Sequence, residues 1–152
     1  MRSILLKQFN GYLSTGGNNR YYIKDLTWQV KQGEHWVLLG GNGAGKSALG
    51  ATLIGEAKQQ SGQRHSTFNN PQLVSSDLQK QLLSANRKSD KPQKVTDILF
   101  SEPEINSDLC QQLITALNFD ALLNHNFTDL STGETRKLLL IKALSANSDL
   151  VV

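Results

Sequence analysis

The sequence contains little of several residue types, and each shortage excludes a class of protein. A single cysteine, Cys110, excludes an internal disulfide framework. Charged residues make up 19% of the chain and hydrophobic residues 38%, a balance that excludes a disordered tail or a coiled coil and allows a buried core. The net charge of +3 is too small to indicate a nucleic-acid partner. No apolar run approaches the roughly 20 residues of a membrane helix, so we expect a cytoplasmic protein without direct membrane insertion.

The N-terminal part of the chain is predicted to be rich in strands. Residues 3–9 (SILLKQF) favour a first strand, and the glycine- and asparagine-rich residues 11–19 favour a turn. Residues 21–30 alternate between apolar and polar side chains, which is typical of a half-exposed antiparallel strand. Residues 35–40 (HWVLLG) form a continuous apolar run, which predicts a strand covered on both faces. Residues 46–55 predict a helix that ends at its final glycine.

The middle of the chain is predicted to be helical. The segments with a helical pattern are residues 75–83, 95–100 and 107–119. Ser107 is placed to cap the last of these helices, and Cys110 is expected to be a buried or half-buried thiol rather than a nucleophile. The polar and cationic residues 86–94 predict a solvated loop in preference to a nucleic-acid contact.

A phosphate-binding loop is the most specific motif in the chain. GGNGAGKS, residues 40–47, matches the Walker A pattern G-x-x-x-x-G-K-[ST] and lies between the predicted apolar strand and a predicted helix. Glycines let the backbone curl so that its N–H groups point at phosphate oxygens, and the helix adds the positive end of its dipole. Lys46 is expected to reach the β- and γ-phosphates, and the Ser47 hydroxyl to ligate Mg²⁺. The predicted nucleotide-binding residues are Gly40, Gly41, Asn42, Gly43, Ala44, Gly45, Lys46 and Ser47.

A second motif, LSTGETRKLLLIKAL at residues 130–144, narrows the choice among phosphate-loop proteins. Ser131 and Glu134 form an S-x-x-E capping box at the start of a helix with an apolar face. After a phosphate loop and before DLVV, this motif resembles the signature sequence of the ABC (ATP-binding-cassette) ATPases, which usually reads LSGGQ. LSTGETRK and GNGAGKSAL look most like the ModF/PhrA-type tandem-cassette proteins of that family. Thr132 replaces a glycine of the usual signature, so its backbone must avoid positive φ.

The resemblance covers the whole chain and implies its fold and ligands. The fold would be α/β, a P-loop NTPase of ABC type, with a mixed central sheet, an N-terminal antiparallel β part and an inserted helical subdomain. Residues 1–152 would form a single incomplete domain, divided into a nucleotide-binding core (1–71), a helical subdomain (72–130) and a signature helix with the start of the Walker B strand (131–152). The ligands would be ATP and Mg²⁺.

The resemblance also implies a partner. Two cassettes of this family pair head to tail, so that the signature of one contacts the ATP held by the other. The partner would be a second cassette, in the same polypeptide or in a homodimer. A membrane permease is a further candidate, and it would place the chain at the inner face of the membrane. The signature residues that would act on the second cassette's ATP are Ser131, Thr132, Gly133 and Glu134.

Two further site residues follow from the resemblance with less specific matches. An aromatic residue near the end of the first strand stacks on adenine in this family. Tyr12 is the best match and Tyr22 the alternative, although either could equally pack in the core or a turn. A glutamine that contacts Mg²⁺ and the attacking water has no clean match. Gln79 is the first choice over Gln72 and Gln81, and for any one of them a solvated helix residue is the competing interpretation.

The function that the resemblance implies is ATP binding and, in the full-length protein, ATP hydrolysis. The alternatives are a nucleotide-binding switch or interaction module without hydrolysis, and the ATPase subunit of a membrane transporter. Near the end of the chain, Ser148 and Asp149 predict a turn, and residues 150–152 (LVV) predict the start of the Walker B strand. We expect an N-terminal fragment that stops before the Walker B carboxylates. Such a fragment holds no catalytic residue and would hydrolyse ATP weakly or not at all. The role of Lys46 would be to stabilise the negative charge of the transition state.

Overall fold

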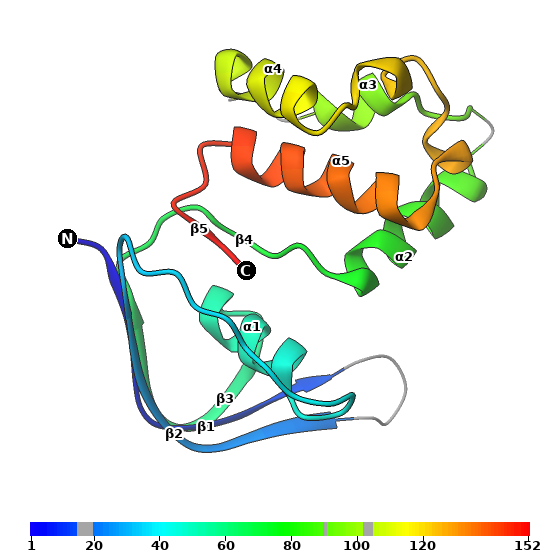
Figure 1. The fold of residues 1–152 in the computed structure, drawn as a ribbon. Helices are drawn as coiled ribbons and strands as arrows, with labels where there is room; N and C mark the ends of the chain where they lie inside the picture. The colour runs from blue at the N-terminus through cyan, green and yellow to red at the C-terminus, as the bar shows by residue number, and fades with distance from the viewer. Residues whose placement is uncertain (15–19, 90, 102–104) are drawn as a thin grey trace. The chain divides into compact units, whose positions relative to one another are not determined.

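Antiparallel strands precede a series of helices in the computed structural model, which describes residues 1–14, 20–89, 91–101 and 105–152 (Figure 1). The chain divides into two compact units. The first consists of residues 1–73 together with Val152, and the second of residues 74–151. We refer to them as the N-terminal unit and the helical unit.

A three-stranded antiparallel sheet forms the frame of the N-terminal unit. Its strands are β1 (Ser3–Ser14), β2 (Arg20–Lys31) and β3 (Lys58–Ser66), in the order β2-β1-β3. The predicted second strand is confirmed, whereas the first strand runs beyond its predicted end. Residues 11–14 are therefore strand and not turn, because β1 pairs with β2 as far as Ser14 and with β3 as far as Tyr12, and this pairing overrides the local preference of glycine for a turn. The remainder of the predicted turn, residues 15–19, lies outside the described residues.

Strand β3 was not predicted from the sequence. Its residues, KQQSGQRHS, show no apolar alternation, and all but two of them are exposed. The strand forms because its backbone pairs with the edge of β1. Main-chain hydrogen bonds can define a strand without any apolar face, so the usual sequence signal is missing here.

Helix α1 (Lys46–Ile54) packs on β1 and β2 and confirms the predicted helix. It ends at Gly55, which has a φ of 91° and takes the C-cap position. The buried residues of the helix are mostly small: Ala48, Gly50, Ala51, Thr52 and Leu53. The buried apolar residues of this unit are Ile4, Leu6, Phe9, Val30, Ala48, Ala51, Leu53 and Phe68.

The prediction of a buried strand at residues 35–40 is wrong for this structure. These residues contain no strand, and the side chains of Val37 and Leu39 are 79% and 89% exposed. A covered strand needs a partner strand along its edge. Both edges of β1 are already occupied, and no other strand among the described residues pairs with this segment. The segment is tethered instead by Trp36, whose ring stands edge-on to Trp28 with 5.2 Å between the ring centroids.

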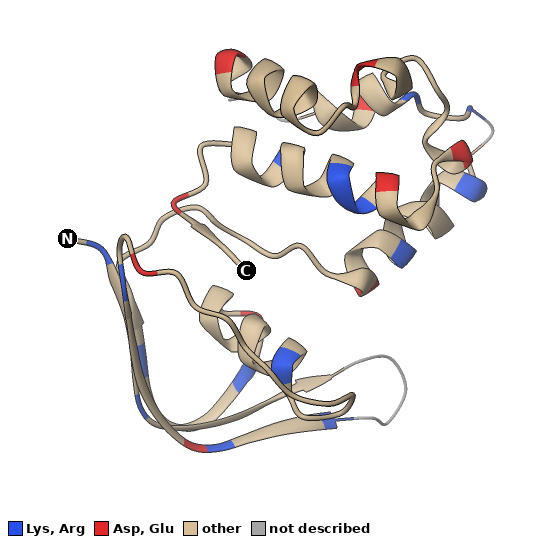
Figure 2. Ribbon diagram, in the orientation of Figure 1, with Lys and Arg blue, Asp and Glu red and all other residues tan. Residues whose placement is uncertain are grey.

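The helical unit confirms the predicted helices with shifted ends. Its elements are α2 (Ser76–Arg87), α3 (Val95–Leu99), α4 (Ser107–Ala116), η1 (Asp120–Leu122), η2 (Phe127–Asp129), α5 (Thr132–Ser145) and β5 (Leu150–Val151). Ser107 does not cap α4, because the preceding Asn106 has the extended backbone of an N-cap and accepts a 3.0 Å hydrogen bond from the Leu109 N–H. Residues of both charge signs are interspersed along the helices (Figure 2). In the part of the chain that is described, no helix is long and apolar enough to cross a bilayer.

An apolar core holds the helical unit together. Cys110 is 1% exposed within this core, which confirms the predicted buried thiol. The core residues are Val95, Ile98, Leu99, Cys110, Ile114, Phe119, Phe127, Leu130, Leu138 and Ile141. Because α5 contributes two of them and Leu130 precedes its first turn, the start of α5 is anchored by buried side chains.

The predicted final strand is present as β5. Within the N-terminal unit, the N–H of Val152 donates a 2.8 Å hydrogen bond to the Gln72 carbonyl, at the end of the short strand β4 (Pro71–Gln72). Val152 also lies close to α1, because a Cβ placed on Gly50 would stand 3.0 Å from a methyl carbon of Val152. The last residue of the sequence thus packs on the helix that follows the phosphate loop.

Candidate nucleotide-binding site and signature turn

The phosphate loop has the backbone that its glycines predict. Gly43 and Gly45 have φ values of 83° and 87°, in the left-handed region where a side chain would be strained. A Cβ placed on either residue would meet no non-neighbouring atom within 4 Å, so it is the backbone conformation and not crowding that favours glycine here. The conformation that exposes the loop's N–H groups is therefore accessible here because these positions are glycine.

The first turn of α1 follows this loop and has no side-chain cap. Its N-cap residue is Gly45, which has no side chain to accept a hydrogen bond from the N–H groups of the first turn. Ser47, in that turn, is exposed, and its hydroxyl is accessible to a ligand. No acidic residue lies in this turn either. Uncapped N–H groups at the positive end of a helix dipole favour an anion such as a phosphate.

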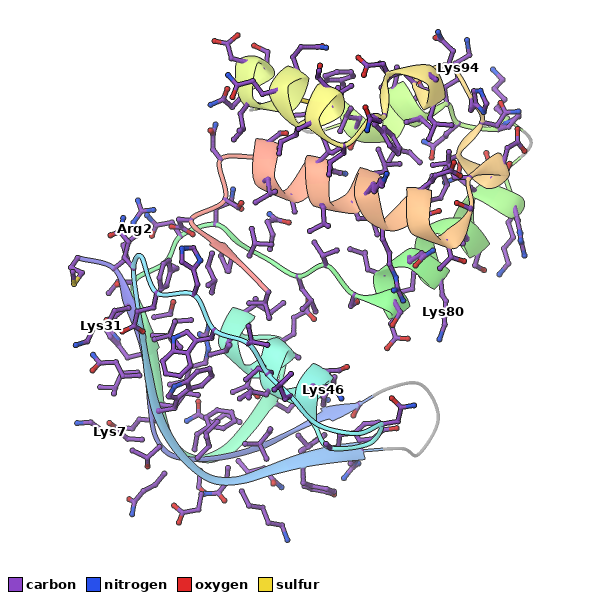
Figure 3. All side chains as sticks on the ribbon, in the orientation of Figure 1. Arg2, Lys7, Lys31, Lys46, Lys80 and Lys94 are labelled. Carbon is purple, nitrogen blue, oxygen red and sulfur yellow. The ribbon has the colours of Figure 1, made fainter. Side chains whose placement is uncertain are left out.

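Lys46 bends back over the loop that precedes it. Its Nζ donates hydrogen bonds of 2.7 Å to the carbonyl oxygens of Gly40 and Gly41 (Figure 3). The ammonium group is thus held by two backbone carbonyl groups at the start of the loop. Charge-assisted bonds to phosphate are stronger than bonds to neutral carbonyls.

Tyr12 lies near the end of β1, where its ring contacts two side chains of β2, Tyr22 and Arg20. It pairs across the strands with Tyr22, at 5.7 Å between the ring centroids. The Arg20 guanidinium carbon lies 4.8 Å from the centroid of the Tyr12 ring. A hydrogen bond with Tyr22 raises the pKa of Arg20, and an arginine side chain is a cation at neutral pH in any case. Arg20 was missed from the sequence, and its spacing of two residues from Tyr22 on an alternating strand was the available signal.

The signature residues form the predicted capping box at the start of α5. The Glu134 N–H donates to the Ser131 Oγ at 3.3 Å, and the Ser131 N–H donates to the Glu134 carboxylate at 2.7 Å. Thr132 is helical and is not among the residues with positive φ, as its side chain requires. Ser131, Thr132 and Gly133 are exposed to solvent. The turn therefore has a fixed backbone and a free outer surface.

Gln79 lies beneath this turn instead of in solvent. It belongs to α2, is 5% exposed, and its Nε2 donates a 3.4 Å hydrogen bond to the Thr132 carbonyl. The interpretation as a solvated helix residue is therefore wrong for Gln79, although it fits the exposed Gln81. Gln72 is engaged elsewhere, because its side chain donates to Asn70 at 2.9 Å. A Mg²⁺ contact from Gln79 stays a prediction.

We predict that acid weakens the capping box. The hydrogen bond from the Ser131 side chain, followed by that from its backbone N–H, lowers the pKa of Glu134 below its ordinary value of 4.5. A lowered folded-state pKa contributes stability above the unfolded-state value, and this contribution is lost as the pH falls through the folded-state value. The melting temperature of the helical unit should therefore fall in this acid range. Thermal unfolding monitored by circular dichroism at a series of pH values measures this fall.

The matched variants for this titration are Glu134→Gln and Glu56→Gln. Glu134→Gln should unfold with a flatter dependence on pH below 4.5 than the original chain. Glu56 is an exposed carboxylate of the other unit, and its variant should keep the original dependence. Parallel curves for Glu134→Gln and the original chain would contradict the assignment of the acid effect to the capping box.

Comparison with known proteins gives a consistent family match. The family model described as "ABC transporter" matches residues 23–152. The ATP-binding protein ModF of Escherichia coli (strain K12) is 33% identical over 133 residues, which cover 81% of this chain and 27% of ModF. The uncharacterized ABC transporter ATP-binding protein YmeB of Lactococcus lactis subsp. lactis (strain IL1403) is 28% identical over 153 residues, 89% of this chain and 58% of YmeB. The chain thus spans only part of the length of these relatives.

Solved structures share the fold. A protein described as a metal-chelate type ABC transporter, in an inward-facing conformation, has a TM-score of 0.68 at 21% identity and is matched over 99% of this chain and 59% of its own. A protein described as a cobalt transport ATP-binding protein has a TM-score of 0.68 at 22% identity, over 97% of this chain and 57% of its own. The predicted α/β fold of ABC type is confirmed.

Proposed function

Because the chain belongs to the ABC transporter family of ATP-binding proteins, we propose that it binds Mg-ATP through residues 40–47. In the whole protein, the site would hydrolyse ATP at a head-to-tail interface between two cassettes. The observation that carries this proposal is the uncapped start of α1 behind a loop with two glycines at positive φ, with the Lys46 ammonium bonded to the Gly40 and Gly41 carbonyls. The identity of 33% to ModF supports placing the chain near the ModF/PhrA-type proteins.

Each residue of the loop has a role in this proposal. The N–H groups of the loop and of the first turn of α1 would bind phosphate oxygens, and Lys46 would leave the Gly40 and Gly41 carbonyls to bind the β- and γ-phosphates. The exposed Ser47 hydroxyl would hold the magnesium ion, which neutralises phosphate charge when it is bound with ATP. Tyr12 would supply the surface on which the base stacks.

The signature turn supports a second cassette as the partner. Ser131, Thr132 and Gly133 are exposed, and the capping box with the Gln79 contact fixes the backbone that carries them. A rigid, exposed helix start of this kind can contact a phosphate group held by another molecule. We propose that this molecule is a cassette in the same polypeptide or in a homodimer. A membrane permease as a further partner and a cytoplasmic location stay predictions.

Titrations with ligands of decreasing phosphate number test this function. With Mg²⁺ present, isothermal titration calorimetry of the full chain should give an affinity that falls from ATP through ADP to adenosine. Adenosine should bind at least roughly 30-fold more weakly than ATP, because it makes none of the charge-assisted phosphate contacts. Equal affinity for ATP and adenosine would reject the phosphate loop as the principal site. Release of phosphate in a single-turnover experiment, above that of a Lys46→Ala control, would distinguish hydrolysis from binding alone.

A further inference from the structure

The C-terminal end of α1 is held by a side chain from another element. Arg64 lies on β3, opposite Leu6 of β1. Its Nε donates a 2.8 Å hydrogen bond to the Thr52 carbonyl, and its Nη2 donates a 2.7 Å hydrogen bond to the Leu53 carbonyl. These carbonyls belong to the last turn of the helix, whose oxygens lack the usual intrahelical partners; the Thr52 carbonyl also accepts a longer, 3.3 Å bond from the Gly55 N–H. The planar guanidinium therefore spans the end of α1 with two bonds at once.

The surroundings of Arg64 are fitted to this contact. Helix α1 has no basic residue in its own last turn, so the guanidinium supplies the cation that the negative end of the helix dipole favours. A Cβ at Gly55 would stand 3.2 Å from three atoms of the guanidinium, and the φ of 91° at this position also favours glycine. Arg64 is partly buried, and this burial lowers the pKa of its guanidinium. The guanidinium of Arg64 thus makes two short hydrogen bonds to the end of α1 and is partly shielded from water.

The same helix carries the phosphate loop at its other end. Helix α1 has nine residues, Lys46 being the first, which corresponds to a length of about 13.5 Å. A helix this short is rigid, so a tilt at its C-terminal end moves the N–H groups at its start by a comparable amount. Hydrogen bonds to phosphate tolerate only a few tenths of an ångström before they weaken.

We propose that Arg64 is a positioning residue for the phosphate loop, which sets nucleotide affinity by fixing α1 on β3 without touching the nucleotide. This inference rests on the proposed function, because it concerns the affinity of the same site. It adds a residue outside the Walker A motif, on a strand that carries no motif of its own.

Two substitutions and one control test this role in the full chain. Arg64→Met removes both hydrogen bonds, and Arg64→Lys keeps the charge without the planar pair of donors. Lys7→Met is the control, because Lys7 is an exposed cation on β1 whose variant loses the same charge (Figure 3). Calorimetry with Mg-ATP and with inorganic triphosphate should show a loss of affinity of roughly tenfold for Arg64→Met. Arg64→Lys should fall between Arg64→Met and the original chain, and Lys7→Met should stay within about twofold of the original.

Amide hydrogen exchange separates positioning from general stability. In Arg64→Met, exchange should accelerate in α1 and in residues 40–47, while exchange in α5 stays unchanged. Unchanged affinity in folded Arg64→Met, or equal acceleration in α1 and α5, would overturn the proposal. If Arg64→Met does not fold, Arg64→Lys is tested instead. Unchanged nucleotide affinity, or equal acceleration of exchange in α1 and α5, would then overturn the proposal. If the original chain binds neither ligand, the proposed function fails, and the exchange of α1 still reports whether Arg64 holds the helix.

Discussion

Replacing Lys46 with alanine should weaken Mg-ATP binding by a factor of roughly 30 to 1000 while the chain stays folded. The estimate follows from the loss of charge-assisted hydrogen bonds to two phosphate groups, worth about 2–4 kcal/mol together. The fold should survive because the two bonds that Lys46 makes without nucleotide are exposed. Once the ammonium is removed, water can bind the Gly40 and Gly41 carbonyls.

Isothermal titration calorimetry with Mg-ATP measures this loss, and thermal unfolding checks that the fold is retained. Lys24→Ala is the matched control, because Lys24 is an exposed lysine of β2 and its variant loses the same charge. Lys24→Ala should bind ATP within about twofold of the original chain, since charges exposed to solvent are screened. Equal losses in the two variants would mean that net charge, and not the loop, determines the affinity.

Replacing Phe127 with alanine should destabilise the helical unit by about 3–5 kcal/mol, the usual cost of removing a buried phenylalanine side chain. Phe127 is 0% exposed and is among the largest fully buried side chains of the chain. Its backbone also joins two segments of the unit, because its N–H donates to the Gln93 carbonyl at 2.9 Å and its carbonyl accepts from the Leu130 N–H at 3.3 Å. The cavity would open in the buried cluster that also contains Leu130, the residue that precedes the signature turn.

Urea unfolding monitored by circular dichroism measures this difference in unfolding free energy. Phe100→Ala is the control, because the Phe100 side chain is 53% exposed and its removal leaves no comparable cavity. The control should lose less than about 1 kcal/mol. A loss for Phe127→Ala no larger than that of Phe100→Ala would show that the core collapses around the missing ring.

The features that depend on neighbouring residues could be predicted from the sequence. The capping box needs only Ser131 and Glu134 three positions apart, and the loop conformation needs glycines at fixed offsets, so both have the predicted form. The helices of the middle segment follow from apolar spacing in the same way. The ends of these helices differ from the predicted ones, as the shift of the α4 cap to Asn106 shows, because several adjacent polar residues can take the cap position.

The features that depend on distant partners could not be predicted in this way. The apolar residues 35–40 have the pattern of a covered strand, but a strand also needs an edge to pair with, which no local pattern supplies. The polar β3 has such an edge and forms without an apolar pattern. The contacts of Gln79 with the Thr132 carbonyl and of Arg64 with the end of α1 join residues far apart in sequence. Their residue types alone gave no signal.

The single buried thiol makes this chain a convenient reporter of its own motions. Cys110 lies in the core of the helical unit and is shielded from reagents while that core is closed. The rate at which it reacts with a thiol-specific dye therefore measures how often the unit opens, without any label being added first. Because the sequence holds no other cysteine, a second one introduced on an exposed surface would react much faster than Cys110. A fluorophore could then be attached at one chosen position, for example beside the signature turn, to detect the approach of another molecule.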